Sequence, residues 1–190
     1  IWGNQGPLVI GNSAGSYGSI SLSDNSNLVS GLLVAPVDAF IGKEGTGSVV
    51  VSDPGTVWVH NGNLYVGKDF TAQGDLFVDN EASVVVDNLY VAGDGTTFGG
   101  VGSVTVGEEG VTGGSVLVNH NAEIGRGRWR LLNVNTGGSC TIEGDLSVGV
   151  GLYTTIGTVY ITGADATLAV HGTTRVGQAN GGIIIEDNAL

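Results

Sequence analysis

A short pattern, in which an apolar-x-apolar triplet precedes a glycine, recurs along the whole 190-residue chain and restricts it to a repeat fold. Copies of the pattern follow one another at intervals of about 28 residues, within the range of solenoid repeats. The pattern ends at Gly11, Gly42, Gly67, Gly93, Gly125, Gly149 and Gly177. This regular glycine predicts that the chain returns to the same corner of a coil in every repeat.

Two further short apolar strands lie between most of these glycines, so a repeat contains three strands, which we name A, B and C in chain order. The A strands are SISL (19–22), SVVV (48–51), DLFV (75–78), SVTV (103–106), RLLNV (130–134), TVYI (158–161) and GIII (182–185). The clear B strands are TVWV (56–59), SVVV (83–86), SVLV (115–118), SCTI (139–142) and TLAV (167–170). The C strands are the glycine-closed triplets.

This organisation predicts an all-β fold, a parallel β-solenoid (β-helix) of about seven coils with open ends. Coils of this kind stack at about 4.8 Å. Residues 1–190 form a single domain in this interpretation, with the first and last coils incomplete. A sandwich of ordinary hairpins would also supply short strands, but it does not require a glycine after every third strand.

The composition agrees with a packed β protein and excludes some partners. Apolar residues make up 41% and charged residues only 13% of the chain, which excludes ordinary disorder. The net charge of −12 argues against nucleic acid, because phosphate binding needs a basic face. No apolar segment is long enough to suggest membrane insertion. We expect no cofactor, although scattered carboxylates leave weak Ca²⁺ binding open.

Alternation within the strands predicts which side chains face the core. In LYVG we expect Leu64 and Val66 to point inward and Tyr65 outward, and in TVWV we expect Trp58 to point outward. Phe40, Tyr65 and Tyr90 then occupy one outward position on successive coils and form an exposed ladder. Such a ladder stabilises stacked strands, binds sugars, or packs against a neighbouring fibre.

The stretch RGRWR (126–130) contains half of the basic residues, namely Arg126, Arg128 and Arg130. Three interpretations stay open for it. The arginines neutralise neighbouring acidic corners of a loop, they contact a partner, or they form a sugar-binding or catalytic cleft. Glu108, Glu109 and Glu123 lie nearby in sequence and could form a polar cleft with the arginines, but the first interpretation is favoured.

Other polar residues are expected to be structural. His60, His120 and His171 follow B strands on alternate coils, too far apart for one metal site. We expect Asn61, Asn88 and Asn121 to form a partial asparagine ladder at one corner. Cys140 is the only cysteine, so no internal disulfide forms, and its strand position predicts a buried, inert thiol.

The segments GTVWVHNGNLYVG (55–67) and LYVGKDFTAQGDLFV (64–78) resemble the repeats associated with bacterial autotransporter and PEP-CTERM surface proteins. The resemblance covers essentially the whole chain, most closely residues 48–118. It implies a secreted β-helix of the kind that builds extracellular rods and adhesins, and it brings no catalytic residues. The expected location is therefore extracellular, at the cell surface.

The two ends of the chain match one internal coil when they are joined. The C-terminal IIIEDNAL followed by the N-terminal IWGNQGPLVIG aligns without a gap with VVVSDPGTVWVHNGNLYVG, which starts at Val49. One explanation is that subunits stack head to tail and complete a split coil; the other is that the chain is a slice of a longer β-helix. The first explanation predicts a subunit interface of Ile1, Trp2, Gly6, Leu8, Ile10, Ile183, Ile184, Ile185, Ala189 and Leu190.

The function expected from these patterns is structural. The chain is interpreted as an extracellular subunit of a head-to-tail filament, whose main partner is a second copy of itself. The alternative is a rod segment of a longer adhesin-like protein that holds glycans or neighbouring fibres. A polysaccharide lyase is less favoured and no enzyme activity is expected, because no nucleophile, base and acid are grouped in the sequence.

Overall fold

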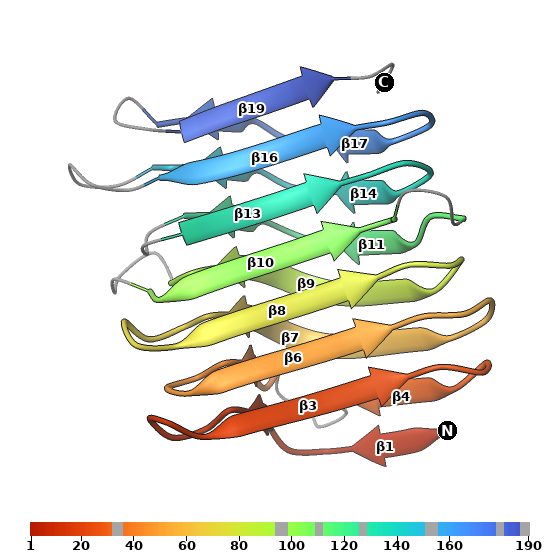
Figure 1. The fold of residues 1–190 in the computed structure, drawn as a ribbon, viewed down its shortest axis with the longest axis vertical. Helices are drawn as coiled ribbons and strands as arrows, with labels where there is room; N and C mark the ends of the chain where they lie inside the picture. The colour runs from red at the N-terminus through yellow and green to blue at the C-terminus, as the bar shows by residue number, and fades with distance from the viewer. Residues whose placement is uncertain are drawn as a thin grey trace.

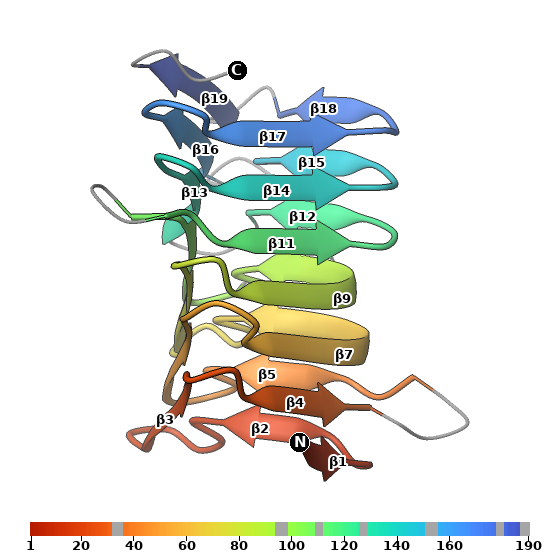
Figure 2. The same ribbon diagram turned by 90° about the vertical axis from the view of Figure 1, so that its right-hand side faces the viewer.

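The computed structural model describes residues 1–31, 36–93, 99–108, 112–125, 129–150, 156–177 and 181–186. These residues form an all-β parallel solenoid of about six turns with open ends (Figures 1 and 2). The prediction of a β-solenoid with three short strands per coil is confirmed. Arg126, Arg128, Ala189 and Leu190 lie outside the described residues.

The A strands form one flat wall of the solenoid, a seven-stranded parallel sheet that faces the viewer in Figure 1. Its strands in chain order are β3 (Tyr17–Leu22), β6 (Thr46–Val51), β8 (Gln73–Val78), β10 (Val101–Val106), β13 (Trp129–Val134), β16 (Gly157–Thr162) and β19 (Gly181–Glu186). Each strand pairs in parallel with the corresponding strand of the next coil, so side chains at one strand position form a column along the rod.

The B and C strands form the remaining walls, which belong to one twelve-stranded parallel sheet. The B strands are β1 (Trp2–Asn4), β4 (Asn27–Ser30), the first half of β7 (Val57–Val66), the first half of β9 (Ser83–Val91), β11 (Ser115–Val118), β14 (Ser139–Ile142) and β17 (Thr167–Val170). The C strands are β2 (Leu8–Ile10), β5 (Ala39–Ile41), the second halves of β7 and β9, β12 (Ala122–Ile124), β15 (Leu146–Val148) and β18 (Thr174–Val176). β7 and β9 pass through the bend without a break (Figure 2).

The core is a set of inward-facing columns, because alternate residues of every strand point into the narrow interior. In β8, Leu76 and Val78 are buried while Phe77 between them is exposed. The C strands follow the predicted phase, with Leu64 and Val66 fully buried. Cys140 also occupies its predicted inward position beside Ile142.

Trp58 faces the core, which contradicts the predicted orientation of its strand. The sequence predicts that Val57 and Val59 face inward, yet Trp58 is completely buried and those valines are only half-buried. Parallel pairing places Trp58 between the inward-facing Leu28 and Val84. The prediction was wrong because the outward pair of valines is uniformly apolar, whereas the buried set includes the polar Thr56 and His60 beside Trp58. Hydrophobicity alone therefore favours the wrong face of this strand.

A column of glycines lines the second position of the A strands. The register aligns Gly18, Gly47, Gly74 and Gly102 on successive coils. A Cβ at Gly74 would lie 2.2 Å from the carbonyl oxygen of Ile41, so the wall meets the preceding corner with no room for a side chain. The lack of space for a Cβ at this corner therefore explains why glycine occupies this position.

A polar ladder runs along the corner between the B and C strands. Asn63 donates to the carboxylate of Asp38 at 2.9 Å, and Asn88 donates to the side-chain oxygen of Asn63 at 3.0 Å. The backbone N–H of Asn121 then donates to the side chain of Asn88 at 3.1 Å. The predicted ladder is therefore present with Asn63 in place of the exposed Asn61, because the residue directly before the C strand carries the column.

Candidate functional site

The two ends of the solenoid carry unpaired strand edges. Within the described residues β1 pairs with β4 and β19 pairs with β16, and the outer edge of each has no partner. Apolar side chains of the inward columns are exposed there, with Trp2 55% and Ile185 60% exposed. Ile183 packs against the core from this edge. Ile184, between Ile183 and Ile185 in β19, lies on the outward side of the strand.

Other residues of the predicted end interface are distributed unequally. Ile1 is fully exposed, and Gly6 is half-open at the corner before β2. Leu8 and Ile10 are already buried within the chain, because β5 covers them. These two side chains therefore belong to the packed first coil and are not exposed at the open N-terminal edge.

The aromatic ladder forms, but it is covered. Phe40 and Tyr65 stack with ring centroids 5.2 Å apart, and Tyr65 and Tyr90 stack at 4.9 Å, both with 13° between the ring planes. The side-chain nitrogen of Lys68 lies 4.8 Å from the Phe40 centroid and 4.7 Å from that of Tyr65. Lys43 also lies over Phe40, at 5.6 Å.

The expectation of an exposed ladder is therefore wrong for Phe40 and Tyr65, each of which is only 8% exposed. Long lysine side chains bend over ring faces because the ring quadrupole attracts the ammonium group. Tyr90 is half-buried. The ladder accordingly stabilises the stack of coils and offers little open ring surface to a sugar.

A buried polar cluster interrupts the core near the N-terminal end. The indole N–H of Trp58 donates to the hydroxyl of Ser30 at 3.0 Å, and this hydroxyl bonds to Nδ1 of His60 at 2.9 Å. All three side chains are buried. Burial lowers the pKa of His60 below its ordinary value of 6.5, because the charged imidazolium would lose its hydration. His60 lies inside the core within β7 and not in a turn.

The cysteine and the acidic residues offer limited chemistry. Burial raises the pKa of Cys140 to about 12, so the thiol is protonated at neutral pH.

A pocket of about 260 Å³ is lined in part by Asp79, Glu108 and Asn135. Burial raises the pKa of Asp79, and the negative charges of Glu108 and Asp53 raise it further. Among the described residues, no three His, Cys, Asp or Glu side chains are grouped closely enough to hold a metal ion.

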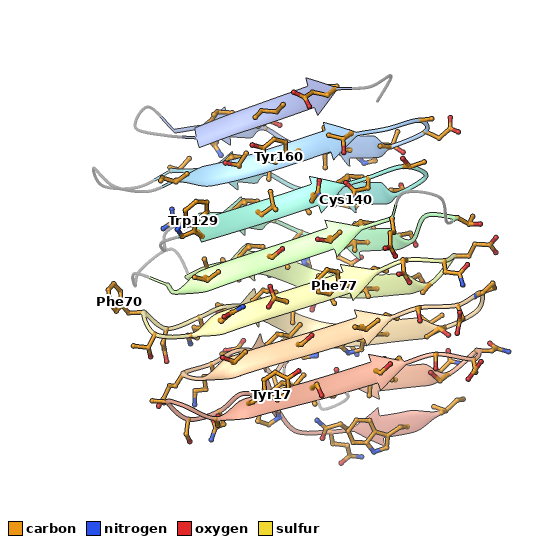
Figure 3. All side chains as sticks on the ribbon, in the orientation of Figure 1. Tyr17, Phe70, Phe77, Trp129, Cys140 and Tyr160 are labelled. Atoms are coloured by element: carbon orange, nitrogen blue, oxygen red, sulfur yellow. The ribbon has the colours of Figure 1, made fainter. Side chains whose placement is uncertain are left out.

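The outer face of the A sheet carries exposed aromatic residues that the sequence analysis did not select. Figure 3 shows Tyr17, Phe77, Trp129 and Tyr160 on this face. Tyr17 is 71% and Trp129 is 75% exposed, and both project from the same strand position on β3 and β13. The alternation of the A strands identifies these positions once the inward columns are assigned, so the sequence contained a signal for them.

A pocket of about 300 Å³ lies at the β10, β13 and β16 part of this face. Trp129, Leu131, Ile156 and Tyr160 supply apolar lining, and Ser103 and Thr158 supply hydroxyl groups. Arg130 also lines the pocket, although it is only 4% exposed. Of the three predicted arginines, this one is the second residue of strand β13, which corrects the interpretation of Arg130 as part of a corner loop.

Comparisons with known proteins add no relative. No protein-family model, curated protein or solved structure matches the chain. No helix long and apolar enough to cross a membrane is found in the described residues.

Proposed function

We propose that the chain is an extracellular structural protein, a rod that lengthens when a second copy adds its coils to an open end. The observation that supports this proposal is the pair of end edges, where strand hydrogen-bonding groups and inward-column side chains are exposed together. Open solenoid ends of this kind associate with further strands unless they are capped. A head-to-tail contact that does not close produces a filament.

Stacking in the register used inside the chain places complementary groups together. A second copy added above β17, β18 and β19 sets its β1, β2 and β3 beside them. Trp2 then covers Leu168, as Trp58 packs next to Leu28 within the chain. Burying a large apolar side chain contributes about 1.5–3 kcal/mol, and the new strand pairs satisfy the backbone groups of both edges.

The surface charge supports a soluble rod with few lateral contacts. A net charge of −12 keeps the sides of neighbouring rods apart, while the end edges are strands with apolar columns. Screening by salt reduces this lateral repulsion, so we expect end-to-end assembly at low salt and additional bundling at high salt. An extracellular location is proposed from the resemblance to surface-protein repeats, and it is independent of the stacking.

Sedimentation velocity of the purified 190-residue chain with two matched variants tests the proposal. Ile185→Lys places a charge in the inward column of β19 and should leave monomers at concentrations where the unmodified chain forms long assemblies. Ile184→Lys places the same charge on the outward side of that strand and should still assemble. Monomers of the unmodified chain at every concentration, or equal assembly of both variants, would contradict the proposal and leave the edges to further coils of the same polypeptide.

A further inference from the structure

Arg130 departs from the column that every other coil obeys. Six positions in its register are glycine, namely Gly18, Gly47, Gly74, Gly102, Gly157 and Gly181. At Gly102, for example, an added Cβ would lie 2.3 Å from the carbonyl oxygen of Val66. A large cationic side chain is therefore the one exception in a position where the fold otherwise requires the smallest residue.

The guanidinium of Arg130 is buried with unused donors. Its Nη1 donates to the backbone carbonyl of Ile156, while Nε and Nη2 have no hydrogen-bond partner among the described residues. Burial lowers the pKa of Arg130 to about 10, so the group is still charged at neutral pH. A buried charge without a partner is costly, and residues that violate the rules of their fold are common at functional sites.

The same residue lies at the pocket on the outer face of the A sheet. Ile156, which accepts the hydrogen bond from Arg130, is 45% exposed and lines this pocket, as do Trp129 and Tyr160. The pocket volume of about 300 Å³ is at the lower end of the range for small-molecule sites. The pocket lining is mainly apolar with a few polar groups. The pocket therefore has room for one or two small rings.

We propose that this pocket binds an acidic sugar, with its carboxylate paired to Nε and Nη2 of Arg130 and its ring packed on Trp129. Two neighbouring guanidinium N–H donors match the two oxygens of a carboxylate. The C–H face of a sugar ring is suited to the negative face of an indole. The hydroxyl groups of Ser103 and Thr158 provide the polar partners that distinguish a sugar from a purely apolar acid.

The burial of Arg130 determines how the ligand enters. Trp129 and Ile156 are exposed side chains that line the same pocket, and the proposal requires the cover over the buried Nε and Nη2 to open before a carboxylate can reach them. Binding therefore changes the surroundings of Trp129, and its fluorescence reports the event. A neutral sugar would contact Trp129 alone and leave the two donors of Arg130 unpaired, so the charge of the ligand is the decisive variable.

Titration with a galacturonate oligomer and with its methyl ester, followed by tryptophan fluorescence and calorimetry, tests the proposal. The acid and the ester share one ring shape and differ in charge. We expect the acid to bind at least tenfold more tightly, because paired hydrogen bonds between a guanidinium and a carboxylate are stronger than those to a neutral ester. Arg130→Gly introduces the glycine found at this position in the other coils, so the variant should fold normally and lose the preference for the acid.

Three further variants complete the experiment. Trp129→Ala should weaken binding of both ligands by calorimetry, whereas Tyr17→Ala, which removes an exposed ring at the same column position on β3, should weaken neither. Arg130→Lys retains the charge without the paired donors and should lose most of the preference. Equal binding of acid and ester, no binding of either, or an unchanged preference in Arg130→Gly would overturn the proposal.

Discussion

The buried cluster of Trp58, Ser30 and His60 allows a sharp test of how the core is built. Replacing Trp58 by alanine removes a completely buried side chain and leaves a cavity, which costs about 3–5 kcal/mol for this type of substitution. Replacing it by phenylalanine keeps a ring but deletes the indole donor to Ser30, and a buried acceptor without its partner costs about 1–3 kcal/mol.

The solenoid also determines where this loss appears. Each coil contacts only its neighbours, so destabilisation should remain near the altered coil. Native-state hydrogen exchange should show amides of β4, β7 and β9 exchanging roughly a hundredfold to a few thousandfold faster in Trp58→Ala, while β14 and β17 are unchanged. The control Trp129→Ala removes a 75% exposed side chain and should change none of them. A uniform change in all coils, or none near β7, would refute the inward placement of Trp58.

Three other predictions concern single side chains. Because burial depresses the pKa of His60, the unfolding free energy should have its full value above pH 6.5 and decrease as the pH falls below it, and His60→Val should flatten this dependence. Cys140 should react with thiol reagents only after denaturation, and rapid labelling of the folded chain would contradict its burial. Gly74→Ala should lower stability in chemical denaturation by about 1–3 kcal/mol or more, whereas Gly182→Ala, with open space at its Cβ position, should be neutral.

The sequence was sufficient to predict the fold because each coil repeats the same constraints. The glycine after each C strand marks a corner, as Gly67 shows with its φ of 73° and its close approach to the carbonyl of Val101. The alternation of Leu64 and Val66 predicted the core side of the C strands correctly. Three strands per coil then follow from the spacing between the corners.

Side-chain environments were harder to predict because they depend on neighbours in other coils. Trp58 lies in a strand whose outward face, Val57 and Val59, is more uniformly apolar than its buried face, and its pairing with Leu28 and Val84 shows its direction. The burial of Tyr65 depends on Lys68, which bends over the ring from a corner. Arg130 is exceptional only relative to the glycine column, and this column becomes visible when the A strands are placed in register.

Electron microscopy of the 190-residue chain, purified without denaturant, tests the central claim most directly. The account predicts unbranched filaments one solenoid wide. The seven-stranded A sheet at about 4.8 Å per strand sets an axial subunit repeat of roughly 34 Å. Discrete particles at high protein concentration, or filaments with an unrelated repeat, would contradict end-to-end stacking.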